Sequence, residues 1–340
     1  MPEQIKRGVI LMNLGSPDST QVRDVRKYLV EFLMDKRVID SPYLVRTMLV
    51  KGVITPFRAP KTAEAYGAIW GEEGSPLVAI TKQLQQAVQR QISEPVEIAM
   101  RYGNPGMKTA YDKLYAANPG IEEVILLPLY PHYAMSSYET AVEHAKTVHR
   151  KGKYPFRITA IPPFYNHPAY IGAQAESIRP YIENNNTHLL FSYHSIPERH
   201  IIKSDITRSH CLQSANCCET PSPAHARCYR HQCFATTRLV TERLGISKDD
   251  YSVSFQSKLG RAEWLKPSTA LRMGQMPREG IRDLAVVCPS FVSDCLETLE
   301  EIAIREKENF LTAGGERFNF IPCMNTQPQW VSAIVTLIGN

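Results

Sequence analysis

Short apolar runs rich in Val, Ile, Leu and Phe alternate with longer amphipathic stretches along the whole chain. The runs are nearly continuous, which is typical of parallel strands buried on both faces. They predict strands at residues 8–14, 96–102, 124–130, 156–162, 188–193, 251–256, 284–288 and 317–322. The amphipathic stretches predict helices at 22–34, 80–91, 140–150, 295–310 and 330–338.

The two halves of the chain have similar patterns. Residues 126–130 form an apolar strand that leads through a Ser-rich turn into an acidic helix start, and residues 286–290 do the same. This predicts an α/β fold of two similar Rossmann-like units, each with a parallel sheet flanked by helices, and a cleft between them. Chance similarity between two ordinary βαβ units is the alternative. We divide the chain into an N-terminal unit, 1–165, and a C-terminal unit, 166–340.

Composition narrows the class of protein. The chain has 340 residues, of which 43% are hydrophobic and 21% charged, so it is not disordered or fibrous. The net charge of +5 is dispersed, which gives no indication of a nucleic-acid partner. No apolar run is long enough to span a bilayer, and the N-terminus lacks a signal-peptide pattern. These features predict a cytoplasmic protein.

Candidate catalytic residues lie where strands end, because open parallel sheets bind ligands beyond the carboxyl ends of their strands. His194 follows the strand 188–193 and is a candidate base or metal ligand; a strand-end histidine bonded to the backbone is the alternative. If a helix begins near Asp294, then Asp294, Glu297 and Glu301 share one face and form an acidic wall. The alternative is a capping box of Asp294 and Glu297.

Aromatic and cationic residues gather in the predicted strand-end loops. A cleft lined by rings and a few guanidinium groups suits a flat aromatic ligand that carries carboxylates, although each ring alone is more often part of the core. The candidates are Arg58, Tyr66, Ser75, Tyr102, Tyr130, Tyr133, Trp264 and Phe291.

Five of the eight cysteines lie between Cys211 and Cys233. In a reducing compartment such cysteines are thiols or metal ligands rather than disulfides. The spacing is Cys211-x5-Cys217-Cys218-x9-Cys228-x4-Cys233, without a C-x2-C pair. Four thiolates can hold a 2Fe–2S cluster or Zn²⁺, and free thiols are the third alternative.

Several of these segments together resemble one family. Residues 190–197, which read Leu-Phe-Ser-Tyr-His-Ser-Ile-Pro, resemble the signature of the ferrochelatases, enzymes that insert ferrous iron into a porphyrin. The similarity extends over nearly the whole chain. Further matching segments are 11–17, 58–66, 74–76, 101–103, 130–133, 255–257, 264–265 and 291–301.

The resemblance implies a function and a set of site residues. It implies insertion of Fe²⁺ into protoporphyrin IX to form protohaem, the terminal step of haem biosynthesis, by a lyase with the chelatase fold. His194 and Glu297 would be catalytic and bind iron, and Asp294 and Glu301 would form the acidic wall beside them. The porphyrin would be contacted by Leu14, Arg58, Tyr66, Ser75, Arg101, Tyr133 and Phe291. The family pattern differs at Cys295, where many relatives have a second histidine.

The resemblance also extends to the cysteines, because a bacterial class of the family holds a 2Fe–2S cluster in an internal segment. It implies that an insert at about 205–229 supplies Cys211, Cys217, Cys218 and Cys228 as ligands, with Cys233 as the alternative to Cys217. Two other functions stay open: a chelatase for Co²⁺ or Ni²⁺, and a non-catalytic haem or iron–sulfur sensor. Apolar residues at 29–34 and 43–53 are compatible with docking on the inner membrane face, or with covering the core.

Overall fold

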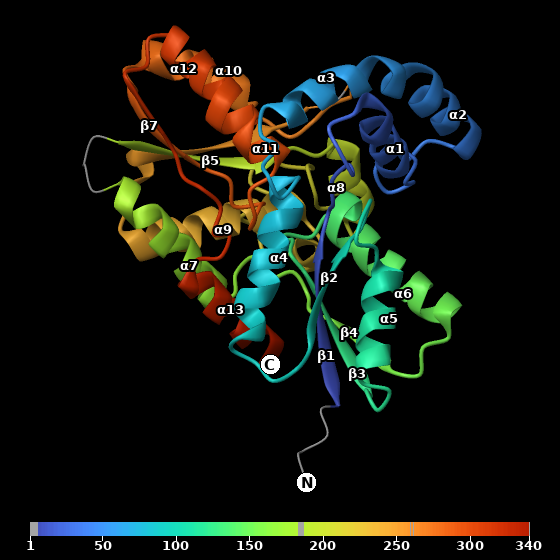
Figure 1. The fold of residues 1–340 in the computed structure, drawn as a ribbon. Coiled ribbons are helices and arrows are strands. Elements are labelled where there is room, and N and C mark those ends of the chain that lie inside the picture. Colours follow the sequence, from blue (N-terminus) through green and yellow to red (C-terminus); the bar gives the residue numbers. More distant parts are fainter. Residues whose placement is uncertain (1–5, 183–186, 259, 261, 340) are drawn as a thin grey trace. The chain divides into compact units, whose positions relative to one another are not determined.

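The structure, a computed structural model, describes residues 6–182, 187–258, 260 and 262–339 (Figure 1). The chain divides into two compact units. The first contains the residues up to Leu129, Met135–Pro162 and the segment from Ile334 onward, and the second contains Tyr130–Ala134 and Pro163–Ala333. Each unit has its own sheet and its own covering helices, so each is described by itself.

The first unit is built on a four-stranded parallel sheet with the order β2-β1-β3-β4. The strands are β1 (Arg7–Asn13), β2 (Val96–Met100), β3 (Glu123–Pro128) and β4 (Arg157–Ala160). Right-handed crossovers place α4 on one face of this sheet and α5 and α6 on the other (Figure 1). The helices are α1 (Val22–Leu33), α2 (Tyr43–Thr47), α3 (Thr55–Gly67), α4 (Pro76–Gln89), α5 (Met107–Ala117) and α6 (Thr140–Gly152), with π-helical turns η1 (Met48–Ile54) and η2 (Met135–Glu139).

The second unit repeats this topology with the strand order β6-β5-β7-β8. Its strands are β5 (His188–His194), β6 (Tyr251–Gln256), β7 (Asp283–Val287) and β8 (Arg317–Phe320). The remaining helices are α7 (Pro168–Ile178), α8 (Glu198–Ser204), α9 (Tyr229–Leu244), α10 (Thr269–Gln275), α11 (Leu296–Leu299), α12 (Lys307–Thr312) and α13 (Pro328–Gly339). Shorter turns are η3 (Arg179–Tyr181), η4 (Pro223–Ala226), η5 (Lys248–Asp250), η6 (Met276–Glu279) and the π-helical η7 (Glu301–Glu306). The shared order confirms the predicted pair of parallel α/β units.

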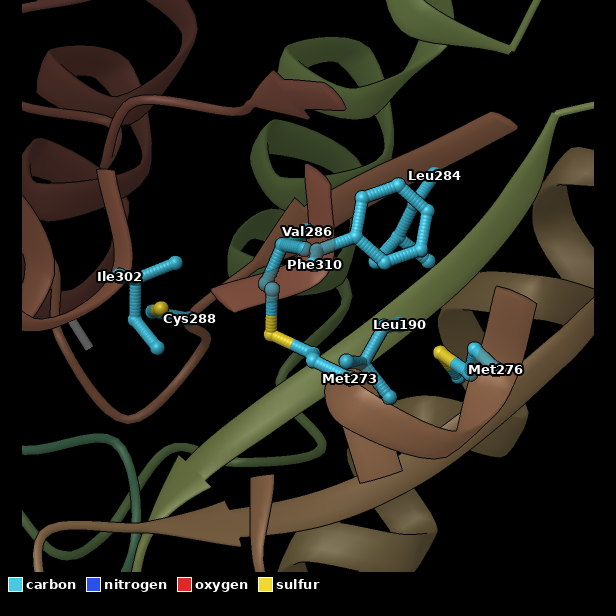
Figure 2. Packing of buried hydrophobic residues seen from close by; sticks show 8 residues of the cluster. All are labelled: Leu190, Met273, Met276, Leu284, Val286, Cys288, Ile302 and Phe310. Atoms are coloured by element: carbon cyan, nitrogen blue, oxygen red, sulfur yellow. The ribbon is translucent and has the colours of Figure 1, made fainter. Parts of the chain in front are cut away.

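A compact apolar cluster fixes one face of the second sheet (Figure 2). Leu190 of β5 and Val286 of β7 pack against Met273 of α10 and Phe310 of α12, all fully buried. Burying each such side chain contributes roughly 1.5–3 kcal/mol. The cluster therefore holds the strands whose carboxyl ends carry His194 and the loop toward Glu297.

Several helices differ from the sequence prediction, which did not include α3, α5 and α7. The single helix predicted at 295–310 is divided into α11, the π-helical turn η7 and α12. Helix α9 did not emerge from the hydrophobic pattern, because its buried face carries Gln232, Thr236, Thr237 and Thr241 rather than a continuous apolar stripe. Among the described residues, no helix combines the length and apolar character needed to cross a membrane.

Candidate active site

His194 is the last residue of β5 and is only partly buried. Its backbone N–H donates to Ser290 Oγ at 2.9 Å, and its ring Nδ1 lies 2.6 Å from the carbonyl oxygen of Ser195. A carbonyl oxygen only accepts, so Nδ1 carries the proton and the lone pair of the neutral ring is on Nε2. The ring of Phe291 meets the imidazole edge-on, with 6.1 Å between centroids. These contacts fix both the tautomer and the plane of the ring.

Glu297 lies in α11, beyond the carboxyl end of β7, and is also partly exposed. Its backbone carbonyl accepts a hydrogen bond of 2.6 Å from Gln256 Nε2. Gln256 Oε1 in turn accepts from Ser192 Oγ at 2.7 Å. Since Ser192 lies two residues before His194 in β5, the buried Gln256 side chain connects the elements that carry the two candidate catalytic residues.

Asp294 is more deeply embedded than the other two acids, with 4% of its surface exposed. Its carboxylate accepts hydrogen bonds from Thr298 Oγ1 at 2.9 Å, Asn325 Nδ2 at 2.7 Å and the backbone N–H of Cys323 at 3.2 Å. The alternative interpretation, a capping box of Asp294 and Glu297, is wrong, because Cys295 caps α11 and its box partner is Thr298. Asp294 instead ties the start of α11 to the loop after β8.

Glu301 completes the acidic group at the start of η7. Its carboxylate accepts hydrogen bonds from the backbone N–H of Ser257, at 2.9 Å, and from the Ser257 hydroxyl. Burial raises the pKa of Glu301, and the negative charge of Glu297 acts in the same direction. The charge of Glu297 thus acts on Glu301, whereas Asp294 is occupied in structural bonds. The π-helical turn shifts the register after Glu301 and is the kind of irregularity often found at functional sites.

The first unit carries five of the candidate porphyrin contacts, in loops beyond strand ends and on α3. Leu14 follows β1, and Ser75 precedes α4 and donates to Ser16 Oγ at 2.6 Å. Gly15, which lies between Leu14 and Ser16, has φ +103°. A Cβ at this position would lie 1.8 Å from the carbonyl oxygen of Tyr102. This turn therefore requires glycine.

On α3, Arg58 is partly exposed and Tyr66 is buried, with its ring edge-on to Trp70 at 5.8 Å. In the second unit, Tyr133 is buried, and its backbone N–H donates to Gln232 Oε1 at 2.7 Å. The guanidinium of Arg227 lies 5.8 Å from the centre of the Tyr133 ring. Arg58 thus has the exposure that a contact with a ligand carboxylate requires.

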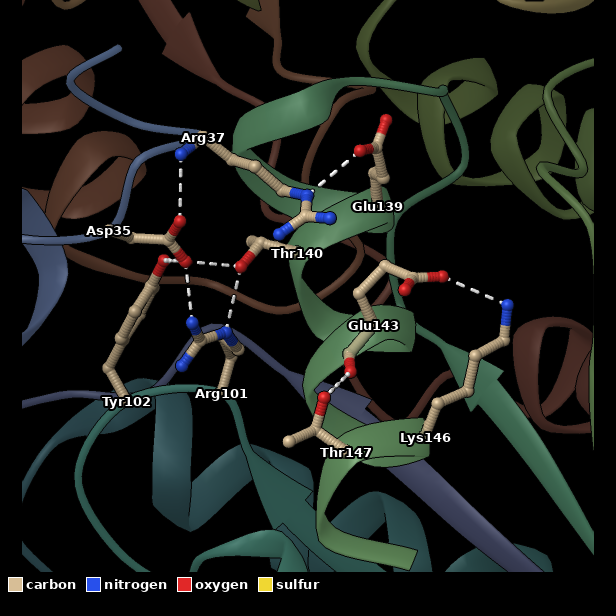
Figure 3. A network of polar contacts seen from close by, with 9 residues as sticks. All are labelled: Asp35, Arg37, Arg101, Tyr102, Glu139, Thr140, Glu143, Lys146 and Thr147. Carbon is tan, nitrogen blue, oxygen red and sulfur yellow. Dashed lines mark hydrogen bonds and ion pairs between the residues drawn. The ribbon is translucent and has the colours of Figure 1, made fainter. Parts of the chain in front are cut away.

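Arg101, a further candidate contact, takes part in a dense polar network (Figure 3). Its Nη2 donates to Asp35 Oδ2 at 2.5 Å, its Nε donates to Thr140 Oγ1 at 2.9 Å, and its guanidinium stacks 4.2 Å from the centre of the Tyr102 ring. A cavity of about 470 Å³ adjoins the network. It is lined by Met34, Asp35, Lys36, Arg37, Arg46, Arg101, Thr140, Glu143, His144 and Thr147.

The cysteine insert, residues 205–229, gathers four thiols in the second unit. Burial raises the pKa of the Cys211 thiol, and the neighbouring Cys228 thiol acts in the opposite direction; Cys228 and burial raise the pKa of the Cys218 thiol. Backbone and guanidinium N–H groups also point at the sulfurs: Leu212 N lies 3.4 Å from Cys217 Sγ, and Arg230 Nη1 lies 3.3 Å from Cys218 Sγ. The assignment of Cys211, Cys217, Cys218 and Cys228 as one ligand set stays a prediction.

Cys233 has different surroundings. It is fully buried in α9, burial raises the pKa of its thiol well above the usual value, and Tyr229 hydrogen-bonds to it. Among the described residues, no three His, Cys, Asp or Glu side chains are placed to share one metal ion. A 2Fe–2S cluster requires a different ligand arrangement, because its four cysteines bind as two pairs, one pair at each iron. All eight cysteines, which lie within the described residues, are free of disulfides.

Sequence reasoning placed Gln256 only among the strand-end positions, without a role, and did not find Ser290 and Tyr229 as parts of the site. Gln256 ends a predicted strand and Ser290 follows another, so their positions were suspect, but nothing in the sequence shows that they bond to Glu297 and His194. Tyr229 follows the last cysteine of the insert, and its hydroxyl donates to the carbonyl of His194 at 2.9 Å. Only the fold brings this tyrosine to β5.

Comparison with known proteins agrees with these observations. The sequence model of the ferrochelatase family matches residues 6–340. The ferrochelatase of Ectopseudomonas mendocina is 46% identical over 331 residues, which cover 97% of this chain and 96% of the relative. The ferrochelatase of Pseudomonas entomophila is 46% identical over 334 residues, 98% of each chain.

A solved structure shows a similar fold at low identity. SirB from Bacillus subtilis with Fe³⁺ superposes with a TM-score of 0.55 at 13% identity, over 98% of this chain and 94% of SirB. At this identity the similarity concerns the fold alone. It supports the pair of α/β units described above.

Proposed function

The chain belongs to the ferrochelatase family, and we propose that it uses His194 and Glu297 to insert Fe²⁺ into protoporphyrin IX. The protein is a metal chelatase of the lyase class, and its product is protohaem. Both proposed catalytic side chains lie beyond strand ends of the second sheet, and both are partly exposed. The single observation that carries the assignment is the tautomer of His194, which the bond from Nδ1 to the Ser195 carbonyl fixes.

The chemistry explains why that tautomer matters. A free-base porphyrin holds two N–H protons, which must leave before a metal ion can bind all four nitrogens. A general base accepts a proton through a nitrogen lone pair, and in the Nδ1–H tautomer of His194 that lone pair is on Nε2. Because Nδ1 is bonded to the backbone, the ring keeps its direction when Nε2 takes up a proton. Imidazole nitrogen and carboxylate oxygen also suit Fe²⁺ as the incoming substrate.

The acids have separate roles in this proposal. Glu297 accepts protons or holds the incoming Fe²⁺, and Glu301 adds a second carboxyl group, whose pKa is raised by burial and by the charge of Glu297. Asp294 positions α11 through Thr298 and Asn325 rather than meeting the substrate. A metal that must be transferred has to be held weakly, so this proposal assigns no closed ligand set to His194, Glu297 and Glu301.

The porphyrin has to be bound by its edges so that its centre can distort. Arg58, which is partly exposed on α3, is suited to pair with a propionate, and Phe291 lies against the imidazole that would face the ring nitrogens. Binding energy gained at the edges can offset the strain of a puckered macrocycle. Arg101 is paired with Asp35, so its contribution in this proposal is to shape the loop after β2.

We further propose that Cys211, Cys217, Cys218 and Cys228 bind a 2Fe–2S cluster. The fit rests on the number and type of donors in one segment and on the N–H groups of Leu212 and Arg230, which lie 3.4 Å from Cys217 Sγ and 3.3 Å from Cys218 Sγ. When bound, the cluster would stabilise the insert and respond to redox conditions, since iron insertion itself transfers no net electrons. The carboxylate of Asp205 fixes the backbone before Cys211, because it accepts hydrogen bonds from the N–H groups of Thr207, His210 and Cys211.

Contact with a membrane surface is the last part of the proposal. Helices α2 and α3 and the turn η1 expose an apolar strip next to Arg58. It consists of Tyr43, Leu44, Val45, Met48, Val53 and Phe57, each more than half exposed. Residues 29–34, the other segment considered for membrane docking, do not belong to the strip, because Leu29 and Leu33 are buried in the core. We propose a cytoplasmic protein that docks through the strip on the inner membrane face, where an apolar porphyrin dissolves.

The catalytic assignment is tested by porphyrin metallation followed by absorbance. His194→Ala and Glu297→Gln should each reduce iron insertion by at least about a hundredfold, while fluorescence titration shows that protoporphyrin still binds. His167→Ala is a matched control, because that histidine caps α7 on the surface. Near-normal turnover of either site variant contradicts the assignment. Assays with Co²⁺ and Ni²⁺ establish the metal preference.

A further inference from the structure

Tyr229 holds the peptide of His194 from outside the strand. Its hydroxyl donates to the carbonyl oxygen of His194 at 2.9 Å, and 4% of its surface is exposed. The N–H of the same histidine donates to Ser290 Oγ at 2.9 Å. The backbone on both sides of the imidazole is thus fixed by side chains outside β5.

The same tyrosine is the first residue of α9, directly after Cys228. Cys228 is the N-cap of this helix, and its sulfur accepts the backbone N–H of His231 at 3.5 Å. An N-cap determines how the first turn of a helix begins. A covalent bond from Cys228 to a cluster would therefore fix the turn that carries Tyr229.

The ring of Tyr229 has little freedom in its pocket. His132 meets it edge-on at 5.8 Å and meets Tyr193 at 5.4 Å. His132 is itself held by Thr236 of α9, with 3.0 Å between Nε2 and Oγ1. A ring enclosed in this way cannot absorb a shift of the helix start by rotating, so a shift would reach its hydroxyl.

We propose that Tyr229 is a positioning residue that transmits the state of the cysteine insert to His194. With Cys228 bound to the cluster, the start of α9 is fixed, the Tyr229 hydroxyl stays on the His194 carbonyl, and the imidazole keeps its direction. Without that bond the first turn of α9 loosens, and the hold on His194 weakens. This inference rests on the proposed function, because it takes His194 as the base and Cys228 as a cluster ligand.

The first test removes the hydroxyl alone. Tyr229→Phe should lower kcat for iron insertion about tenfold, because small misplacement of a catalytic group has large effects, while KM for the porphyrin and the cluster absorbance stay unchanged. The matched control is Tyr138→Phe, which removes a tyrosine hydroxyl that donates to the Ile161 carbonyl at 3.0 Å in the first unit. A kcat of Tyr229→Phe within twofold of the parent would overturn the proposal.

The second test separates transmission from a local effect. Cys228→Ser, or removal of the cluster from the folded parent with an iron chelator, should lower kcat. If Tyr229 transmits this loss, adding Tyr229→Phe should lower kcat less than twofold further. If kcat of the double variant falls by the product of the two single fold-reductions, the two changes act independently and the proposal is overturned. The chelator experiment provides the answer should the serine variant fail to fold.

A spectroscopic readout is independent of turnover. In histidine-labelled protein, the Nδ1–H resonance of His194, assigned by its absence in His194→Gln, reports the bond to Ser195. It should shift or exchange faster in Tyr229→Phe and after cluster removal, but not in Tyr138→Phe. An unchanged resonance in both cases overturns the inference. Failure of the proposed function would look different: an active His194→Ala, or a parent protein without iron and acid-labile sulfide.

Discussion

The side chain of Gln256 donates a hydrogen bond of 2.6 Å to the carbonyl oxygen of Glu297. Its amide oxygen accepts from Ser192 Oγ at 2.7 Å, and 2% of the residue is exposed. One buried amide at the end of β6 therefore fixes the first turn of α11 relative to β5. The position of Glu297, the proposed catalytic acid, therefore depends on Gln256 as well as on α11 itself.

Replacing Gln256 by Leu should damage both stability and turnover. The substitution leaves the Glu297 carbonyl and the Ser192 hydroxyl without this partner, which costs about 1–3 kcal/mol in the free energy of unfolding. It should also lower kcat about tenfold, because α11 is no longer held against β5. Gln85→Leu is the matched control: Gln85 Nε2 donates to the Val96 carbonyl at 2.6 Å in the first unit. Urea unfolding and metallation kinetics measure the two effects, and equal kcat in both variants would refute the positioning role.

The cysteine ligands can be separated by substitution. Serine at Cys211, Cys217, Cys218 or Cys228 should abolish the visible absorbance of the cluster and the associated iron and acid-labile sulfide. Cys233→Ser should retain the absorbance, the iron and the sulfide, because Cys233 is fully buried on α9, next to Tyr229. Retention of the cluster in Cys217→Ser together with its loss in Cys233→Ser would establish the alternative ligand set. A parent protein without iron or sulfide would exclude the cluster altogether.

Much of the fold could be predicted because it depends on local sequence. Continuous apolar runs located the strands; the run at 251–256 coincides with β6, and the run at 8–14 is displaced by one residue from β1. The internal similarity of the two halves predicted the repeated strand order. Helix α9 could not be predicted in this way, because its buried face bonds to other elements through Gln and Thr side chains instead of apolar packing.

The site was less predictable, because its geometry depends on contacts between residues distant in sequence. The spacing of Asp294, Glu297 and Glu301 indicated one acidic face, but a helix that starts at Leu296 and passes into a π-helical turn gives each acid different partners. Arg101 shows the same limit. The family resemblance implied a porphyrin contact for Arg101, but it could not show that the fold pairs this residue with Asp35, which is 66 positions away in sequence.

The exposed apolar strip on α2, η1 and α3 predicts binding to lipid vesicles. Replacing Leu44 and Met48, each 75% exposed, by Ser should weaken co-sedimentation with anionic vesicles severalfold, since each removes apolar area from the interface. Folding should not change, because neither side chain is buried. Leu271→Ser is the control, because Leu271 is 67% exposed on α10 of the second unit, outside the strip. Equal vesicle binding by parent and strip variant would exclude docking through this surface.

The Asp35–Arg101 pair predicts a pH-dependent contribution to stability. Burial of Asp35 disfavours its charge, but hydrogen bonds from Thr140 and from the Arg37 backbone and the charge of Arg101 together lower its pKa below the ordinary 3.8 (Figure 3). A carboxyl whose folded-state pKa is lowered stabilises the fold above its unfolded-state pKa. That contribution is lost as the pH falls through the lowered folded-state value.

Asp35→Asn should therefore lower the free energy of unfolding by about 3 kcal/mol near neutral pH, since it leaves the Arg101 guanidinium without its charge partner in a site where the Asp35 side chain is only 5% exposed. The difference from the parent should narrow as the pH falls below about 3.8, because the parent then protonates Asp35 as well. Glu122→Gln, which breaks an exposed pair with Lys6, should change stability by less than about 1 kcal/mol. Urea unfolding of the three proteins between about pH 7 and pH 2.5 measures this dependence. A difference between Asp35→Asn and the parent that stays constant over this range would show that the residue acts through packing, not through its charge.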